Sequence, residues 1–272
     1  MSALNKKTAL LSTSLRLLCT DFDGTIAEPD HAPISAGFFE RLAECRARGQ
    51  LYWVINTGRT LESLLDELRA RQAPIWPDWV VTVEREIWLV RDRRGIGWFE
   101  WNRKCELLHS QLFESVKPFW KLVEDYTVKH TRARLVEDPG SPLAIIASCE
   151  EEADEIGAYI QPLLQNWPML VPVRNSIYFR FSHKFYHKGA CLEAISNGIG
   201  VLPAQIMAAG DHLNDLPMLD RRYAHHLACP HNAVDEVKEK VRVQGGHVSS
   251  ADVAEGTIEA WDKFFPRHAS KR

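Results

Sequence analysis

The stretch LRLLCTDFDGT, at residues 15–25, is the strongest indication of the fold class in this chain. Its first half is apolar and has the length of a short buried strand, and the carboxylates of Asp21 and Asp23 follow it directly. Ligands of open α/β sheets bind at the carboxyl ends of the strands. We therefore expect both carboxylates at such an edge, although a tight acidic turn or a helix cap uses the same residue types.

Strand and helix patterns alternate in the segments around this stretch. Residues 35–48 have an apolar helical face, with Ser35 as the expected N-cap and Gly49 as the stop, and residues 51–68 continue with a buried strand and a leucine-rich helix. The same alternation returns from residue 188 onward. This rhythm predicts an α/β fold with a Rossmann-like, doubly wound parallel sheet that is covered by helices on both faces.

The pattern changes between these two segments. Short strands around residues 84–86 predict hairpins of an antiparallel or mixed sheet. We therefore expect one core domain, formed by residues 1–73 and 187–272, which is divided by an inserted α+β domain at residues 74–186. The insertion holds seven of the nine tryptophans: Trp76, Trp79, Trp88, Trp98, Trp101, Trp120 and Trp167. These rings can stack on sugar rings or, as the plainer interpretation, pack the insertion's own core.

The composition excludes several classes of partner. The 33 Lys and Arg residues nearly balance the 36 Asp and Glu residues, which argues against a protein that binds nucleic acid through its phosphates and against a polybasic membrane-surface protein. The sequence has no apolar run as long as a membrane span, and we expect no export signal. The six cysteines are dispersed without a C-x-x-C pair, so we expect a cytoplasmic protein without disulfides.

Two further segments carry groups that suit a phosphate. Thr57 and Gly58 end the second strand, where a hydroxyl and backbone N–H groups can bind phosphate oxygens at the start of a helix, although ordinary turns use the same residues. Lys188 begins a predicted helix, where the helix dipole disfavours a cation. That position indicates an anion as its partner, but a solvated surface lysine is the simpler interpretation of Lys188 taken alone.

A fourth segment, GDHLND at residues 210–215, follows a predicted strand at residues 206–209. Its short polar side chains, Asp211, Asn214 and Asp215, can supply oxygens to a hard cation such as Mg²⁺. Asx turns that cap the next helix would also explain them. The histidines of the chain show no spacing typical of zinc ligands.

Taken together and in this order, the DFDGT, TGR, lone lysine and GD-x-x-ND segments resemble the four motifs of the haloacid-dehalogenase-like hydrolase superfamily. The large insertion between the second and third segments resembles the type-two (IIB) cap of that superfamily, which governs substrate specificity. The tail, with Asn232-Ala233 and Gly256-Thr257-Ile258, is similar to the subgroup of Cof-like and sucrose-phosphatase-like members. The sequence departs from the pattern of relatives at Glu84-Arg85-Glu86 and at Arg180. The substrate contacts of those relatives therefore cannot be carried over to this chain.

This resemblance implies a Mg²⁺-dependent phosphatase that acts on a small phosphorylated metabolite, such as a sugar phosphate. Asp21 would attack phosphorus and form an aspartyl-phosphate, and Asp23 would protonate the leaving alcohol and then activate water. The phosphate would be bound by Thr57, Gly58, Lys188 and Asn214. The metal would be held by Asp21, the backbone carbonyl of Asp23, Asp211 and Asp215.

Three other functions use the same kinds of residues. A phosphomutase would return the phosphoryl group to another hydroxyl, and a non-catalytic protein on this scaffold would only bind phosphate. A receiver-like phosphoacceptor also combines acidic residues, a lysine and Mg²⁺. The large insertion and the acid–base role of Asp23 argue against a receiver, because a receiver needs a stable phosphoaspartate.

Overall fold

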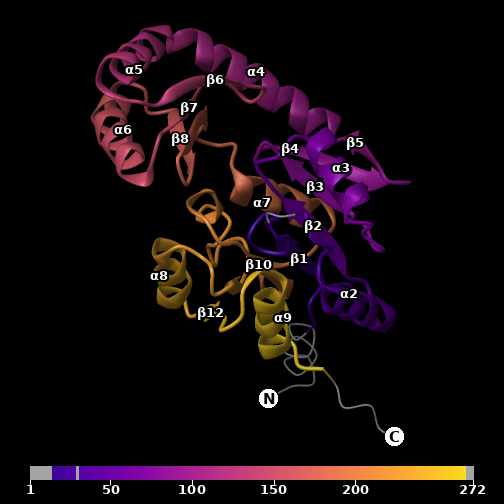
Figure 1. The fold of residues 1–272 in the computed structure, drawn as a ribbon. Coiled ribbons are helices and arrows are strands. Elements are labelled where there is room, and N and C mark those ends of the chain that lie inside the picture. Colours follow the sequence, from indigo (N-terminus) through magenta and orange to yellow (C-terminus); the bar gives the residue numbers. More distant parts are fainter. Residues whose placement is uncertain (1–13, 29–30, 268–272) are drawn as a thin grey trace, which may run out of the picture. The chain divides into compact units, whose positions relative to one another are not determined.

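The computed structural model describes residues 14–28 and 31–267, and the strand expected before Asp21 is present as β1 (Leu17–Thr20). Strand β1 pairs in parallel with β2 (Tyr52–Asn56) on one side and with β10 (Ile206–Ala209) on the other. Figure 1 shows β1 and β10 side by side although they are far apart in the sequence. The parallel part of the sheet continues beyond β10 with β11 (His226–Cys229) and β12 (His247–Val248).

A hairpin extends the other side of this sheet. Strand β3 (Trp79–Thr82) pairs in parallel with β2, and β4 (Glu86–Arg91) and β5 (Arg94–Gly97) follow in antiparallel order. The eight strands therefore have the order β12-β11-β10-β1-β2-β3-β4-β5. We expected this hairpin in the inserted domain, beyond a boundary at residue 74. The hairpin instead belongs to the eight-stranded sheet. A hairpin pattern can be recognised locally, whereas the strand with which it pairs depends on residues far away in the sequence.

Helices cover both faces of the eight-stranded sheet, as the sequence predicted. They are α2 (Ala36–Arg48), α3 (Leu61–Ala70), α7 (Lys188–Gly198), α8 (Asp235–Val243) and α9 (Val253–Phe264). Successive residues of β1 point to opposite faces. Leu18 belongs to the apolar cluster under α2 and α9, whereas the Cys19 thiol lies 4.0 Å from Met218 Sδ on the other face. The predicted α/β fold class is thereby confirmed.

Aromatic rings fill the cluster between the sheet and helices α2 and α9. Phe38 of α2 packs edge-on against Trp53 of β2 at 5.3 Å and against Trp261 of α9 at 6.1 Å. Ser35 is the N-cap residue of α2, but its hydroxyl donates to Glu255 at 2.6 Å instead of capping the helix. The predicted helix start is therefore correct, although the hydroxyl serves a tertiary contact.

The chain divides into two units by its contacts. The core unit contains the residues up to Gly97, Lys188–Asp211 and the residues from Asp215 onward, and the inserted unit contains Trp98–His187 with His212–Asn214. The inserted unit has a four-stranded antiparallel sheet in the order β6-β7-β9-β8. Its strands are β6 (Arg134–Asp138), β7 (Ser141–Ile146), β8 (Leu170–Asn175) and β9 (Tyr178–His183), and its helices are α4 (Phe99–Ser115), α5 (Lys117–His130) and α6 (Glu150–Leu163).

The inserted unit has a core of its own, formed where α5 and α6 cover one face of its sheet (Figure 1). Phe119 and Trp120 of α5 lie 5.2 Å from the ring of Phe181 on β9, and Trp167 packs against Phe119 at 5.4 Å. For these two tryptophans the plainer interpretation, packing of the insertion's core, is the one observed. Among the helices of the described residues, none is both long and apolar enough to span a membrane.

Candidate active site

The turn after β1 carries the first motif and brings it to the carboxyl edge of the sheet. The N–H of Asp21 donates to the carbonyl of Ala209, the last residue of β10, at 2.9 Å. Gly24 has a φ of +72°, and a Cβ at this position would lie 2.4 Å from Asp211 Oδ2. Glycine is therefore needed here both for the backbone conformation and for the close approach of a carboxylate.

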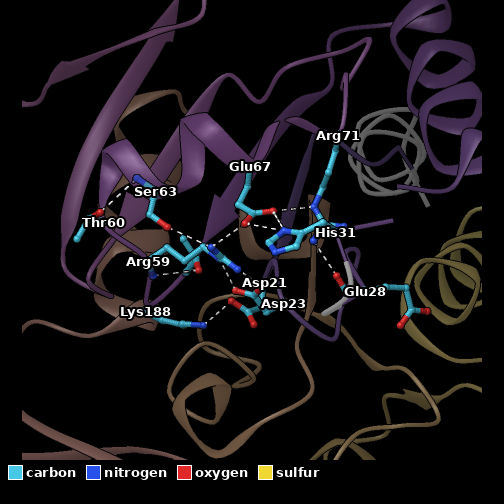
Figure 2. Close-up of polar contacts among 11 residues, drawn as sticks. Asp21, Asp23, Glu28, His31, Arg59, Thr60, Ser63, Glu67, Arg71 and Lys188 are labelled. Atoms are coloured by element: carbon cyan, nitrogen blue, oxygen red, sulfur yellow. Dashed lines mark hydrogen bonds and ion pairs between the residues drawn. The ribbon is translucent and has the colours of Figure 1, made fainter. Parts of the chain in front are cut away.

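Lys188 joins two of the predicted acidic residues. Its ammonium is fully buried and donates to Asp21 Oδ1 at 2.8 Å and to Asp215 Oδ1 at 2.6 Å (Figure 2 shows the contact with Asp21). Burial alone would lower the pKa of this ammonium, but the two carboxylates outweigh burial and raise it above its ordinary value. The interpretation of Lys188 as a solvated surface lysine is therefore wrong.

The backbone of Lys188 is fixed by the neighbouring strand. The side-chain amide of Asn56, the last residue of β2, donates to the Lys188 carbonyl at 3.0 Å. Asn56 is fully buried, so this bond ties the start of α7 to the edge of the sheet. Lys188 is thus held in place through both its side chain and its backbone.

Three carboxylates form an acidic group beside this ammonium. One oxygen from each of Asp21, Asp211 and Asp215 lies within 4.8 Å of the other two. Asp215 Oδ2 accepts from the Asp211 N–H at 2.8 Å, and Thr25 Oγ1 donates to Asp211 Oδ1 at 2.8 Å. A Cβ on Gly210 would lie 2.5 Å from the Asp215 side chain, so glycine allows that carboxylate to enter the site.

The acidic group brings three carboxylates close to one ammonium, that of Lys188. Burial, followed by the charge of Asp215, raises the pKa of Asp211 to about 7 and the pKa of Asp21 well above its ordinary value. Among the described residues, the Lys188 ammonium pairs with two of these carboxylates, those of Asp21 and Asp215. Hard carboxylate oxygens gathered at one point suit a divalent cation such as Mg²⁺. The residues present therefore fit a metal site.

The Asp23 side chain does not belong to the acidic group. Its carboxylate makes a two-point ion pair with Arg59, with Nε to Oδ2 and Nη2 to Oδ1 both at 2.7 Å (Figure 2). This partner raises the pKa of the Arg59 guanidinium. No role was predicted for Arg59 from the sequence. The available signal was its position directly after Thr57-Gly58 at a strand end.

The other predicted phosphate ligands lie on two loops. Thr57 and Gly58 connect β2 to α3, and the N–H of Thr57 donates to the Val81 carbonyl at 2.9 Å. Thr57 Oγ1 accepts from the Arg59 N–H at 3.2 Å, so its own hydroxyl proton can be donated elsewhere. Asn214 is buried and directly precedes Asp215, in the segment that groups with the inserted unit.

Comparison with known proteins agrees with this fold. A model of the haloacid dehalogenase-like hydrolase family matches residues 113–255, which is more than half of the chain. The chain belongs to this family. The resemblance seen in the sequence is thereby confirmed, and so is the prediction of an enzyme of the hydrolase class.

Solved structures of this family share the fold over nearly the whole chain. The sucrose-phosphatase of Synechocystis sp. PCC6803, solved with sucrose and phosphate, has a TM-score of 0.69 at 16% identity and covers 92% of this chain and 98% of its own. The subclass IIB sugar phosphatase BT4131 has a TM-score of 0.61 at 18% identity, with 92% and 98% covered. The phosphatase BT1666 of Bacteroides thetaiotaomicron has a TM-score of 0.60 at 21% identity, with 93% and 96% covered.

Proposed function

We propose that this protein is a Mg²⁺-dependent phosphatase that hydrolyses a small phosphorylated metabolite, such as a sugar phosphate, through an aspartyl-phosphate on Asp21. The observation that carries the proposal is the buried Lys188 ammonium between Asp21 and Asp215, next to Asp211. A carboxylate and a cation fixed together at the carboxyl edge of a parallel sheet suit an anionic substrate. The similar sucrose-phosphatase and sugar phosphatase support the choice of substrate class.

Mg²⁺ would be held by the carboxylates of Asp21, Asp211 and Asp215 and by the backbone carbonyl of Asp23. When bound, the ion supplies positive charge to the oxygens of the transferring phosphoryl group. The fit of these residues to a hard cation supports this part of the proposal, because three carboxylates lie beside the one positive charge of Lys188.

The first chemical step uses Asp21 as the nucleophile. Its carboxylate oxygen forms a bond to phosphorus while the bond from phosphorus to the ester oxygen breaks. Asp23 gives its proton to the leaving alcohol, and the phosphoryl group remains on Asp21. Lys188 lowers the cost of the negative charge on Asp21 and on the phosphoryl oxygens. The Thr57 hydroxyl, the Gly58 N–H and the Asn214 side chain would hold the phosphate.

The second step returns the enzyme to its starting state. A water molecule attacks phosphorus, the bond from phosphorus to Asp21 breaks, and Asp23 takes the proton of the water. Inorganic phosphate leaves, and Asp23 holds the proton that the next leaving group needs. We also propose that the protein acts in the cytoplasm, because its six cysteines are dispersed without a C-x-x-C pair, as is usual in a reducing compartment.

The proposal is tested by measuring inorganic phosphate released from a panel of sugar phosphates with Mg²⁺, with EDTA, and with EDTA followed by excess Mg²⁺. We expect release only when Mg²⁺ is available. A second readout is the melting temperature, which Mg²⁺ should raise in the wild type and raise less in Asp211→Asn. Conversion of a sugar phosphate without release of phosphate would identify a phosphomutase. Binding without any turnover would identify a non-catalytic phosphate-binding protein.

A further inference from the structure

Every nitrogen of the Arg59 guanidinium contacts a neighbouring side chain. Its Nε and Nη2 atoms bind the two oxygens of Asp23, and Nη1 donates to Ser63 Oγ at 3.1 Å and to Glu67 Oε1 at 3.4 Å (Figure 2). The guanidinium also lies 5.6 Å from the centre of the Phe22 ring. Phe22 stands between the two aspartates of the first motif in the sequence, and its side chain is fully buried. Arg59 is therefore held against Asp23 on one side and against Ser63 and Glu67 on the other.

A two-point ion pair with one guanidinium restricts the orientation of a carboxylate. An aspartate on a turn otherwise samples several side-chain rotamers, but two parallel N–H···O bonds fix both the position and the plane of the carboxylate. The side chain of Asp23 remains 40% exposed, so the ion pair holds it without removing it from solvent. Arg59 therefore orients a carboxylate that water can still reach.

Glu67 of α3 holds the far side of this guanidinium. Its carboxylate lies between three groups, with Arg59 Nη1 at 3.4 Å, Arg71 Nε at 3.0 Å and His31 Nδ1 at 3.0 Å. Burial alone would raise the pKa of Glu67, but hydrogen bonds from His31 and Arg71 and the charge of Arg59 hold it below its ordinary value. An ionised Glu67 thus accepts from both arginines at once and fixes the spacing between them.

Arg71 anchors the other end of this chain of contacts. Its side chain is fully buried and donates to Glu67 and to the backbone carbonyl of Glu28 (Figure 2). It also donates to the backbone carbonyl of Ala32. Its guanidinium lies 5.6 Å from the centre of the Phe22 ring, as does that of Arg59. Arg59 before α3 and Arg71 after it thereby contact the segment that bears Asp23 at two points.

We propose that Arg59 is a positioning residue that holds the Asp23 carboxylate for the second step, the attack of water on the aspartyl-phosphate, and that Glu67 keeps Arg59 in place. The inference rests on the proposed function, because it assumes that Asp23 accepts the proton of the water. That proton transfer requires a carboxylate held in a fixed orientation, and a two-point pair with a guanidinium provides that orientation.

The step that this positioning serves can be isolated with p-nitrophenyl phosphate. Its leaving group is stable as an anion and needs little protonation, so kcat/KM reports formation of the aspartyl-phosphate with little help from Asp23. The second step limits kcat when the intermediate accumulates, and the first turnover then appears as a burst of p-nitrophenol. A defect confined to the second step lowers kcat and KM together and leaves kcat/KM unchanged.

The primary variant is Glu67→Gln, and the matched control is Asp66→Asn. Asp66 is the preceding residue on α3, and its exposed carboxylate forms an ion pair with the exposed Arg69. We expect Glu67→Gln to lower kcat and KM each by about tenfold, with a burst approaching one p-nitrophenol per active site. Arg59→Lys keeps the charge but loses the two-point geometry, and we expect a loss in kcat of about 100-fold with the same signature.

Three outcomes overturn the inference, provided that the wild type releases phosphate and Asp66→Asn matches it. They are an unchanged kcat in both Glu67→Gln and Arg59→Lys, a fall in kcat/KM as large as that in kcat, or a fall in kcat without a burst. An equal fall in kcat/KM would indicate a merely structural role. A wild type that releases no phosphate from any ester would instead refute the proposed function, so the two failures are distinguishable.

Discussion

Two groups of charged side chains lie around the turn after β1, and they differ in their balance of charge. The first is the buried group of Lys188 with Asp21, Asp211 and Asp215. The second is the chain of contacts formed by Asp23, Arg59, Glu67 and Arg71. The first group has an excess of carboxylates, whereas the second pairs each carboxylate with a guanidinium.

This difference in charge balance assigns different tasks to Asp21 and Asp23, the two aspartates of the first motif. Unbalanced buried charge is unfavourable until a cation or a suitable ligand arrives, so the first group is suited to binding and chemistry. Balanced pairs with two-point geometry gain little from a further ion, but they fix orientation. Asp21 and Asp23 are only two residues apart, yet they belong to different groups and are suited to different roles.

The largest expected effect is on the first group. Asp21→Asn removes the proposed nucleophile, and we expect phosphate release to fall by a factor on the order of 10⁴ or more. The protein should remain folded, because Lys188 keeps Asp215 as a partner. Initial rates and the melting temperature measure both effects, with Asp235→Asn, which changes a fully exposed carboxylate, as the control. Wild-type turnover by Asp21→Asn would exclude this residue as the nucleophile.

The next effect compares buried with exposed ion pairs. Lys188→Met leaves the buried carboxylates without their ammonium, and we expect it to lower the free energy of unfolding by about 3–5 kcal/mol. Lys129→Met is the control, because Lys129 forms an exposed pair with Asp125 whose loss should cost less than about 1 kcal/mol. Urea unfolding in EDTA measures both values without a cation that could replace the ammonium. Equal losses would show that Lys188 is not essential to the charge balance of the site.

The smallest effect tests the balanced group through its pH dependence. The pKa of Glu67 is lower in the folded protein than its ordinary value of 4.5, so its stabilising contribution is present above pH 4.5 and is lost as the pH falls below it. We expect Glu67→Gln to be about 2 kcal/mol less stable than the wild type at pH 7. That difference should shrink in urea unfolding experiments as the pH approaches 3. A difference that stays constant from pH 7 to pH 3 would contradict an ionised Glu67 between its partners.

The helices and strands around the motifs could be predicted from the sequence because their signals are local. The apolar run before Asp21, the glycine stop of α2 at Gly49 and the strand before residue 210 each depend on neighbouring residues alone. The order of the four segments then indicated the family, which the match to residues 113–255 confirmed. The metal-binding and catalytic roles of the named residues stay predictions.

Other features required the tertiary structure because they depend on residues far apart in the chain. The hairpin of β3, β4 and β5 follows local rules, but only the pairing of β3 with β2 assigns it to the core sheet. Lys188 resembled a surface lysine in the sequence, and its burial results from the convergence of β1, α7 and the loop at Asp215.

The sequence by itself determined the α/β class, the four motifs and the identity of Asp21, Asp23, Thr57, Lys188 and Asp211 as candidates, because spacing and residue type are properties of a single stretch of chain. The tertiary structure alone decided that Arg59 pairs with Asp23 and that Glu67 supports Arg59. A contact between side chains of different elements depends on how those elements pack, and no local pattern contains that information.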